Sequence, residues 1–243
     1  MNILITGHRG MIGSRLYEYL KKEDRYSVDG IDIVDGSGDI LTFQFNKIYN
    51  IVIHCAALTS VVDSIKYPDK YYKTNVLGSN NIIKQCTNSK LIFFSTSAVY
   101  GEGLNHSEIS PYKPPCPYAK NKVAVEAIIK NTLKNWLILR LSNIFGGIKG
   151  ERNVYQVFEE EDILPIYGNG NSIRDYLHVD TLVKIVCKNL EKCGTYNIGS
   201  GQLKTVLDIA KEFNKPIKYF PKRFGEIEAI SLDLTKAKKD KLL

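Results

Sequence analysis

Cysteine, histidine and long apolar runs are all scarce in this sequence of 243 residues. Its five cysteines are scattered and form no Cys-x-x-Cys pair, which favours reduced, mostly buried thiols over a disulfide framework. Only four histidines are present, none in a His-x-x-x-His arrangement, so we expect no metal site. No apolar run approaches the roughly 20 residues of a membrane helix, and the chain opens on a strand-like run without a basic and apolar leader. We therefore expect a cytoplasmic protein with no membrane partner.

The charge of the chain is basic but dispersed. Lysine and arginine number 33 against 26 aspartates and glutamates, which gives a net charge of +7. A basic surface suits nucleic acid, anionic membranes or phosphorylated small molecules, and solubility alone explains it equally well. The only cluster is small and consists of Lys236, Lys238, Lys239 and Lys241. We therefore expect no nucleic-acid partner.

Short β-branched apolar runs alternate with stretches of helical period through most of the chain. Continuous apolar runs are typical of strands that are covered on both faces. The predicted strands are 2–6, 26–31, 50–54, 91–95 and 136–140, and the predicted helices are 12–22, 64–87 and 118–134. This alternation predicts an α/β protein with a Rossmann-type, doubly wound parallel sheet.

The pattern becomes irregular after Gly146 and resumes with a predicted helix over 178–191 and a strand over 195–199. We infer a Rossmann domain that binds a dinucleotide, made of residues 1–145 plus 177–199. The remaining residues, 146–176 plus 200–243, predict a small, discontinuous substrate-binding lobe.

Three glycines at three-residue spacing, Gly7, Gly10 and Gly13, lie between the first predicted strand and the first helix. The first allows a sharp turn, the second lets the main chain approach a pyrophosphate, and the third lets the helix pack on its strand. The helix N-terminus adds free N–H groups and a partial positive charge. The spacing predicts a dinucleotide-binding turn.

An acidic residue, Asp32, follows the second predicted strand. A carboxylate at that place accepts both ribose hydroxyls and repels the 2′-phosphate of NADP, so the sequence favours NAD. Asp35 is a competing candidate, although it lies beyond the strand, and a solvated loop acid would also explain Asp32. Arg9 instead favours NADP, because a basic side chain in the glycine turn suits a 2′-phosphate.

Tyr118 and Lys122 are four residues apart in the helix that follows the proline-rich stretch 111–117, so they share one helix face. A free tyrosine has a pKa of about 10, and lowering it to about 7 requires about 4 kcal/mol of phenolate stabilisation. A nearby ammonium together with a cationic nicotinamide can supply it in a partly dry cleft. Hydroxyl residues 95–97 follow a buried strand, at the end where such sheets bind ligands.

These features resemble the extended short-chain dehydrogenase/reductase family, and within it the NAD-dependent nucleotide-sugar epimerase/dehydratase group typified by UDP-glucose 4-epimerase. The similar segments run in order along nearly the whole chain: 6–13, 28–32, 38–40, 54–57, 71–78, 95–101, 118–122, 139–146, 168–180, 196–201 and 223–226. The chain is short for this family, so the sugar pocket is expected to be open.

The resemblance implies a role for each matching residue. The catalytic set would be Thr96, Tyr118 and Lys122. The residues that bind NAD would be Gly7, Arg9, Gly10, Met11, Ile12, Gly13, Asp32, Asp39, Ile40, Ala56, Ala57, Asn75, Tyr118 and Lys122. The residues that bind the nucleotide-sugar would be Thr96, Asn143, Asn153, Ile166, Tyr167, Arg174 and Arg223. Surface ion pairs would equally explain the two arginines, and packing within the lobe would explain Tyr167.

The resemblance also narrows the reaction. Dehydratases of the group carry an Asp-Glu pair just after the hydroxyl residue, and related decarboxylases carry a glutamate nearby; the places concerned hold Ser97 and Ala98 here. Epimerisation of a nucleotide-sugar, a UDP-sugar at C4, is therefore the predicted activity. The alternatives are a nucleotide-sugar reductase similar to GDP-fucose synthase and a non-catalytic NAD-sensing protein. Helices 64–87 and 118–134 match those that pair two subunits in relatives, which predicts a homodimer.

Overall fold

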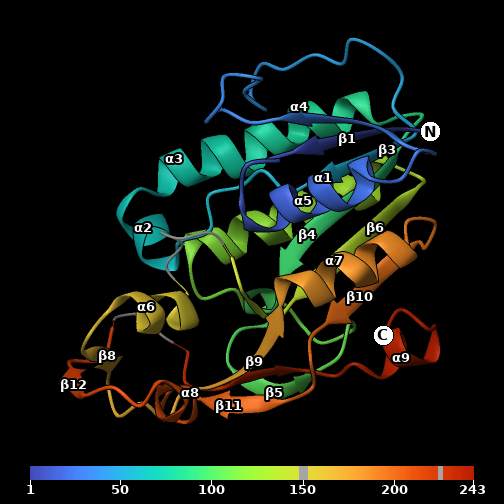
Figure 1. The fold of residues 1–243 in the computed structure, drawn as a ribbon. Helices are drawn as coiled ribbons and strands as arrows, with labels where there is room; N and C mark the ends of the chain where they lie inside the picture. Colours follow the sequence, from blue (N-terminus) through green and yellow to red (C-terminus); the bar gives the residue numbers. More distant parts are fainter. Residues whose placement is uncertain (148–152, 224–226) are drawn as a thin grey trace.

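A computed structural model of the chain describes residues 1–147, 153–223 and 227–243, and it is built on a six-stranded sheet (Figure 1). The strand order is β10-β6-β4-β3-β1-β2, and all neighbours are parallel. The strands are β1 (Asn2–Thr6), β2 (Ser27–Ile31), β3 (Ile51–His54), β4 (Lys90–Thr96), β6 (Trp136–Leu141) and β10 (Gly194–Ile198). Strands β2 and β3 lie on opposite sides of β1. The strand order therefore reverses between β1 and β3, which is the topological switch point where such sheets bind ligands. The predicted Rossmann-type α/β fold is confirmed.

Both faces of the sheet are covered by helices, as the continuous apolar strands predict. Ile3 and Ile5 pack into a core with helices α1 (Met11–Lys21) and α7 (Val179–Lys188). Leu4, between them, faces the opposite core, which includes α4 (Ser79–Gln85) and α5 (Pro117–Thr132). Alternate residues of a strand point to opposite faces, so a strand that is covered on both sides must be apolar throughout.

The predicted helix over 64–87 is wrong as one continuous element. It is divided into α2 (Val61–Lys66), α3 (Pro68–Tyr72), the π-helical segment η1 (Lys73–Gly78) and α4. Pro68 explains the break, because a proline disfavours the helical conformation in the residue before it, and Tyr67 has φ −129° and ψ 59°. The start is earlier than predicted because Ser60 caps α2 by accepting the N–H of Asp63.

A second, smaller core lies beside the large sheet (Figure 1). It is formed by α6 (Val154–Glu160), β8 (Leu164–Tyr167) and α8 (Val206–Phe213), and β12 (Ile217–Phe220) pairs with β8. A three-stranded sheet of β7 (Asn143–Phe145), β9 (Ile173–His178) and β11 (Leu203–Thr205) connects this region with the large domain.

The end of the chain returns to the large domain. Strand β13 (Ile230–Leu232) pairs with β5 (Gly103–His106), and after α9 (Thr235–Lys239) the side chain of Leu242 joins the core of α1 and α7. The two-lobe division stays a prediction, and these contacts place the last residues of the chain beside the large sheet.

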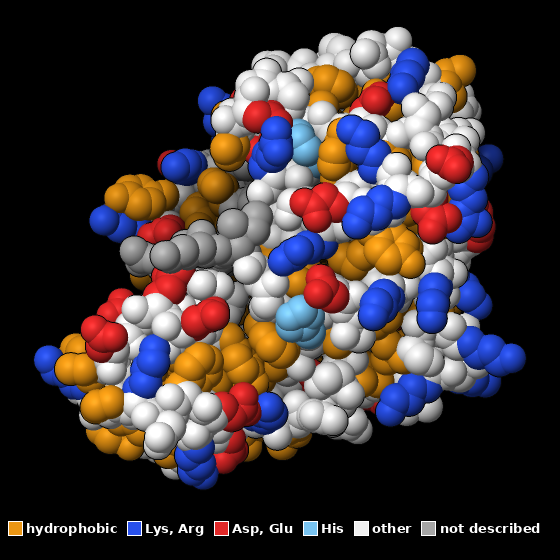
Figure 2. Space-filling view, viewed as in Figure 1, with side chains coloured by type: hydrophobic (Ala, Val, Ile, Leu, Met, Phe, Trp, Pro, Cys, Tyr) orange, Lys and Arg blue, Asp and Glu red, His pale blue; other side chains and the backbone are white. Residues whose placement is uncertain are grey.

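Figure 2 shows lysines and arginines spread over one face of the molecule, with aspartates and glutamates between them. Among the described residues, no helix has both the length and the apolar character needed to cross a membrane.

Candidate active site

The glycine turn between β1 and α1 is packed so closely that side chains cannot enter it. Gly7 has φ +70°, and a Cβ on it would lie 2.6 Å from the main-chain nitrogen of Ala56. A Cβ on Gly13 would lie 2.1 Å from the carbonyl oxygen of Gly7. Gly10, which caps α1, has no side chain to cover the first N–H groups, and the first turn of the helix has no acidic residue. The turn therefore fits a dinucleotide pyrophosphate.

Asp32 directly follows β2 and lies beside this turn, as predicted. Its Oδ2 accepts the N–H of Arg9 at 3.0 Å, and its Oδ1 accepts the N–H of Val34 at 3.0 Å. The carboxylate is thereby oriented by the main chain at the carboxyl end of β2, where a ribose is expected.

The residues predicted near the adenine form the next part of the wall. Asp39 accepts the N–H of Leu41 through Oδ1 at 2.9 Å. The side chain of Ile40 is buried and packs so closely on Gly78 that a Cβ on this glycine would lie 2.7 Å from Ile40 Cδ1. Ile40 thus joins the loop after β2 to η1.

Ala56 and Ala57 continue from β3 past the glycine turn. The N–H of Ala56 is 3.3 Å from Thr6 Oγ1, to which it donates. Asn75, from η1, accepts the N–H of Leu58 at 2.8 Å and donates to the carbonyl of Leu58 at 2.9 Å. The structure therefore gives Asn75 the task of holding this segment in place through Leu58.

His54, at the end of β3, is a buried residue to which the sequence analysis gives no role. Its Nδ1 lies 2.6 Å from Thr6 Oγ1 and its Nε2 lies 2.8 Å from Ser79 Oγ. Burial, with a smaller contribution from the charge of Lys122, lowers the pKa of His54 to about 3. The neutral ring joins β1, β3 and α4 just below the glycine turn. Its place in segment 54–57 was the available signal.

Thr96, Tyr118 and Lys122 lie together at the carboxyl end of β4. Thr96 ends that strand, and its Oγ1 accepts the N–H of Ala98 at 3.2 Å, in the 3₁₀ turn η2 (Ser97–Tyr100). The hydroxyl of Thr96 lies close enough to the phenol of Tyr118 to lower its pKa. Lys122, one turn further along α5, donates to the carbonyl oxygen of Phe94 at 2.7 Å, and its Nζ is 5.9 Å from the centre of the Tyr118 ring. The predicted catalytic residues are thus brought together.

Burial works against charge on both titrating residues of this group. It raises the pKa of Tyr118 well above its usual value, although the nearby hydroxyl of Thr96 acts in the opposite direction. It lowers the pKa of Lys122 to about 8. The protein alone therefore keeps the phenol neutral. The lowered pKa that the sequence predicts for Tyr118 requires a further positive charge nearby, and an oxidised nicotinamide can supply it.

A buried ion pair fixes α5 against the sheet. Arg140, on β6, donates to Glu126 through Nε at 3.0 Å and through Nη2 at 2.7 Å. Ser95, next to Thr96, donates to the same carboxylate at 2.6 Å. One glutamate of α5 is thus bonded to both β4 and β6. The sequence analysis missed this pair, and only the position of Arg140 in segment 139–146 pointed to it.

The predicted substrate residues lie around the second core. Asn143 is exposed on β7. Asn153 caps α6 by accepting the N–H of Gln156 at 3.0 Å, and its Nδ2 is buried with no hydrogen-bond partner among the described residues. Arg174 donates to carbonyl oxygens of residues 173, 227 and 228. Arg174 therefore also holds residues 227 and 228 against β9.

Tyr167 and Arg223 form a stack beside a cavity. The guanidinium carbon of Arg223 lies 3.5 Å from the centre of the Tyr167 ring, whose other neighbour is Phe220 at 5.4 Å. The cavity is lined by Tyr167, Gly168, Asn169, Asn171, Ser172, Lys222 and Glu228. Ile166 instead points into the lobe core and is fully buried, so only its main chain is available to a ligand.

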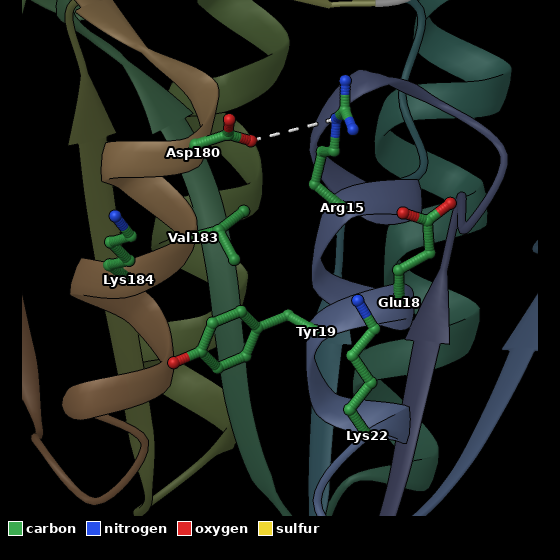
Figure 3. A pocket seen from close by; sticks show the side chains of 7 residues that line it. All are labelled: Arg15, Glu18, Tyr19, Lys22, Asp180, Val183 and Lys184. Atoms are coloured by element: carbon green, nitrogen blue, oxygen red, sulfur yellow. Dashed lines mark ion pairs between the residues drawn. The ribbon is translucent and has the colours of Figure 1, made fainter.

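A second hollow is a groove between α1 and α7, where Arg15 and Asp180 face each other (Figure 3). None of the predicted site residues lines this groove. Among the described residues, no group of three or more His, Cys, Asp or Glu side chains is placed to hold a metal ion.

Three features together define a class of dinucleotide-dependent enzymes: the doubly wound sheet, the glycine turn with its acidic partner, and the Thr–Tyr–Lys group. The model of the NAD dependent epimerase/dehydratase family matches residues 3–199. The chain belongs to this family, and its cofactor is NAD. The predicted family, enzyme class and cofactor are confirmed.

The individual relatives are named as epimerases or as dehydratases. The chain is 32% identical to a putative UDP-glucose 4-epimerase of Methanocaldococcus jannaschii, over 97% of this chain and 90% of the relative. It is 30% identical to a dTDP-D-glucose 4,6-dehydratase of Dictyostelium discoideum, over 86% of this chain but only 61% of that protein. The solved structure of Thermus thermophilus UDP-glucose 4-epimerase with NAD superposes with a TM-score of 0.90 at 25% identity, covering 100% of this chain and 94% of the other.

Proposed function

We propose that the protein epimerises a nucleotide-diphospho-sugar, a UDP-sugar at C4, through a transient 4-keto sugar. The observation that carries the proposal is the convergence of Thr96, Tyr118 and Lys122 at the carboxyl end of β4, beside the glycine turn. NAD, when bound, supplies a reversible hydride acceptor. Two further events are required: one proton moves at the sugar hydroxyl, and the 4-keto sugar turns about its diphosphate so that the hydride returns to its opposite face.

The residues of the chain divide that task between them. Tyr118 exchanges the proton of the sugar hydroxyl, and Thr96, which lies beside the phenol and lowers its pKa, hydrogen-bonds the same oxygen. Lys122 is held by the carbonyl of Phe94, so its charge stays near the phenol without being able to move into solvent. Arg223, stacked on Tyr167, suits the diphosphate of the substrate.

Elimination of water would need a further acid and base that the described site lacks at the relevant place. After Thr96 come Ser97, which is buried, and Ala98, which has no titrating group. This favours epimerisation over the dehydration named for the Dictyostelium relative. The reductase similar to GDP-fucose synthase remains the alternative, since Arg9 lies in the glycine turn.

The test is incubation of the purified protein with UDP-, dTDP-, GDP- and CDP-hexoses without added cofactor, followed by analysis of epimers. We expect the C4 epimer of a UDP-hexose, and we expect Tyr118→Phe to abolish it while NAD binding persists. A 4-keto-6-deoxy product would instead identify a dehydratase, and stoichiometric consumption of NADPH a reductase. Full activity of Tyr118→Phe would refute the proposed role of the phenol.

We also propose a homodimer formed through the helices that flank the cofactor domain. Several apolar side chains of α2, α3 and η1 are more than one-third exposed: Val62, Ile65, Tyr72 and Leu77. Pairing of this surface between two copies would bury them. Light scattering tests this, and a single species of monomer mass would refute it. A cytoplasmic location stays a prediction.

A further inference from the structure

A second carboxylate, Asp35, lies beside the ribose end of the cofactor site. Its Oδ2 accepts a hydrogen bond from Arg9 Nε at 2.7 Å and lies 3.1 Å from His8 Nε2. The main-chain N–H of Arg9 is bonded to Asp32, so this ion pair is next to the carboxylate that is expected to accept the ribose hydroxyls. Both basic side chains of the glycine turn, Arg9 and His8, thus face Asp35.

The loop after β2 is built to hold Asp35 in this position. Ser37 donates to Asp35 Oδ1 through its N–H at 3.1 Å and also through its hydroxyl, and it accepts the N–H of Asp32 at 2.8 Å. The Ser37 hydroxyl and then Arg9 hold the pKa of Asp35 far below its usual range. The carboxylate is therefore ionised at neutral pH.

His8 cannot easily leave the cluster. Its ring lies under β2, where a Cβ on Gly30 would be 2.4 Å from His8 Cγ, and only 8% of its side chain is exposed. The side chain of Arg9 is 56% exposed, so Arg9 is the group that would turn toward a ligand if its partner were removed.

We propose that Asp35 is a specificity-determining residue that reserves the site for NAD by occupying Arg9. A 2′-phosphate would need Arg9 as its partner, because Asp32 on the other side repels it. To obtain Arg9, the phosphate must break the charge-assisted hydrogen bond between Arg9 and Asp35 and leave this carboxylate without its guanidinium partner. The inference rests on NAD as the cofactor and is independent of the sugar substrate.

The test is direct binding of NADH and NADPH, measured by nicotinamide fluorescence after the dinucleotide already carried by the protein has been quantified. In Asp35→Asn the amide oxygen still accepts from Ser37, while the charge that holds Arg9 is lost. We expect the ratio of the NADPH to the NADH dissociation constant to fall about tenfold or more, the size of one charge-assisted hydrogen bond. Adding Arg9→Ala should cancel this gain.

The matched control is Asp180→Asn, which removes the same charge from the Arg15 pair in the groove between α1 and α7 (Figure 3). In this control the ratio of the NADPH to the NADH dissociation constant should equal that of the wild type. An unchanged ratio in folded Asp35→Asn, or a gain that survives Arg9→Ala, overturns the proposal. If Asp35→Asn does not fold, Asp35→Ser gives the same comparison. Epimerase assays play no part, so failure here is separate from failure of the proposed function.

Discussion

The sharpest stability prediction concerns Glu126, whose carboxylate is fully buried on α5. It accepts two hydrogen bonds from Arg140 and one each from Ser95, Tyr112 and the partly exposed Lys130. Glu126→Gln keeps the shape of the side chain and removes its charge. The guanidinium of Arg140, which is 1% exposed, is then left buried without a counter-charge.

The size of the effect follows from this burial. Removal of one partner of a buried ion pair costs about 3–5 kcal/mol, because the remaining charge stays desolvated. Against a typical total stability of about 5–15 kcal/mol, that is a large loss. Urea unfolding followed by circular dichroism measures it, and Glu18→Gln on the surface of α1 is the matched control, with an expected change within about 0.5 kcal/mol.

Two further measurements separate the charge effect from other causes. Replacing both partners, as Glu126→Leu with Arg140→Met, should recover much of the loss, because no charge remains buried. Burial alone would raise the pKa of Glu126, but the hydrogen bonds and charge of Arg140 outweigh it and leave this pKa below its usual value. The glutamate therefore stabilises the fold above the unfolded-state pKa of about 4.3, and the difference between wild type and variant should shrink as the pH falls below it. A loss smaller than about 1 kcal/mol at pH 7 would refute this account of the buried pair.

Three other substitutions test separate parts of the molecule. Lys122→Met should raise the free energy of unfolding at pH 7 by about 1–2 kcal/mol while abolishing epimerisation. Burial lowers the pKa of Lys122 from 10.5 to about 8, a penalty of about 3 kcal/mol on the charged form, while loss of the bond to Phe94 costs about 1 kcal/mol. This gain should fade between pH 8 and 10.5, where the folded protein already holds the lysine neutral, and a destabilised variant would contradict it. Lys215→Met should cost about 1–2 kcal/mol in urea unfolding, because Lys215 donates to three carbonyl oxygens at the end of α6, and an unchanged midpoint would speak against that cap. Gly13→Ala should abolish NAD binding in a fluorescence titration, since its Cβ would lie 2.1 Å from the Gly7 oxygen, and wild-type affinity would mean that the turn can relax.

The parts of the fold that sequence reasoning predicts are those set by neighbours along the chain. Ile3, Leu4 and Ile5 are all fully buried, and a run with no polar alternation already signals a strand covered on both sides. The four-residue spacing of Tyr118 and Lys122 likewise fixes their common direction on α5. Pro68 is the local signal for the break within the predicted helix over 64–87.

The sequence does not reveal hydrogen bonds and ion pairs between residues that are far apart along the chain. Arg174 was predicted for the diphosphate, yet it donates to carbonyl oxygens 53 and 54 residues further along the chain. Glu126 and Arg140 have no local pattern that pairs them, and nothing in the strand over 50–54 says that His54 will be neutral. Such pairings depend on which elements become neighbours, and this is decided only by the complete packing.

At the candidate active site, the requirements of stability and of chemistry conflict. Lys122 is buried although burial disfavours its charge, and Tyr118 lies where burial opposes the phenolate that proton transfer requires. A core selected for stability alone would hold an apolar residue in place of the buried Lys122. That the chain keeps a phenol and an ammonium there, on a helix fixed to the sheet by Glu126, is difficult to explain by packing. It is expected if the missing favourable charge arrives with the bound cofactor, so the unstable pair becomes functional only when the glycine turn is occupied.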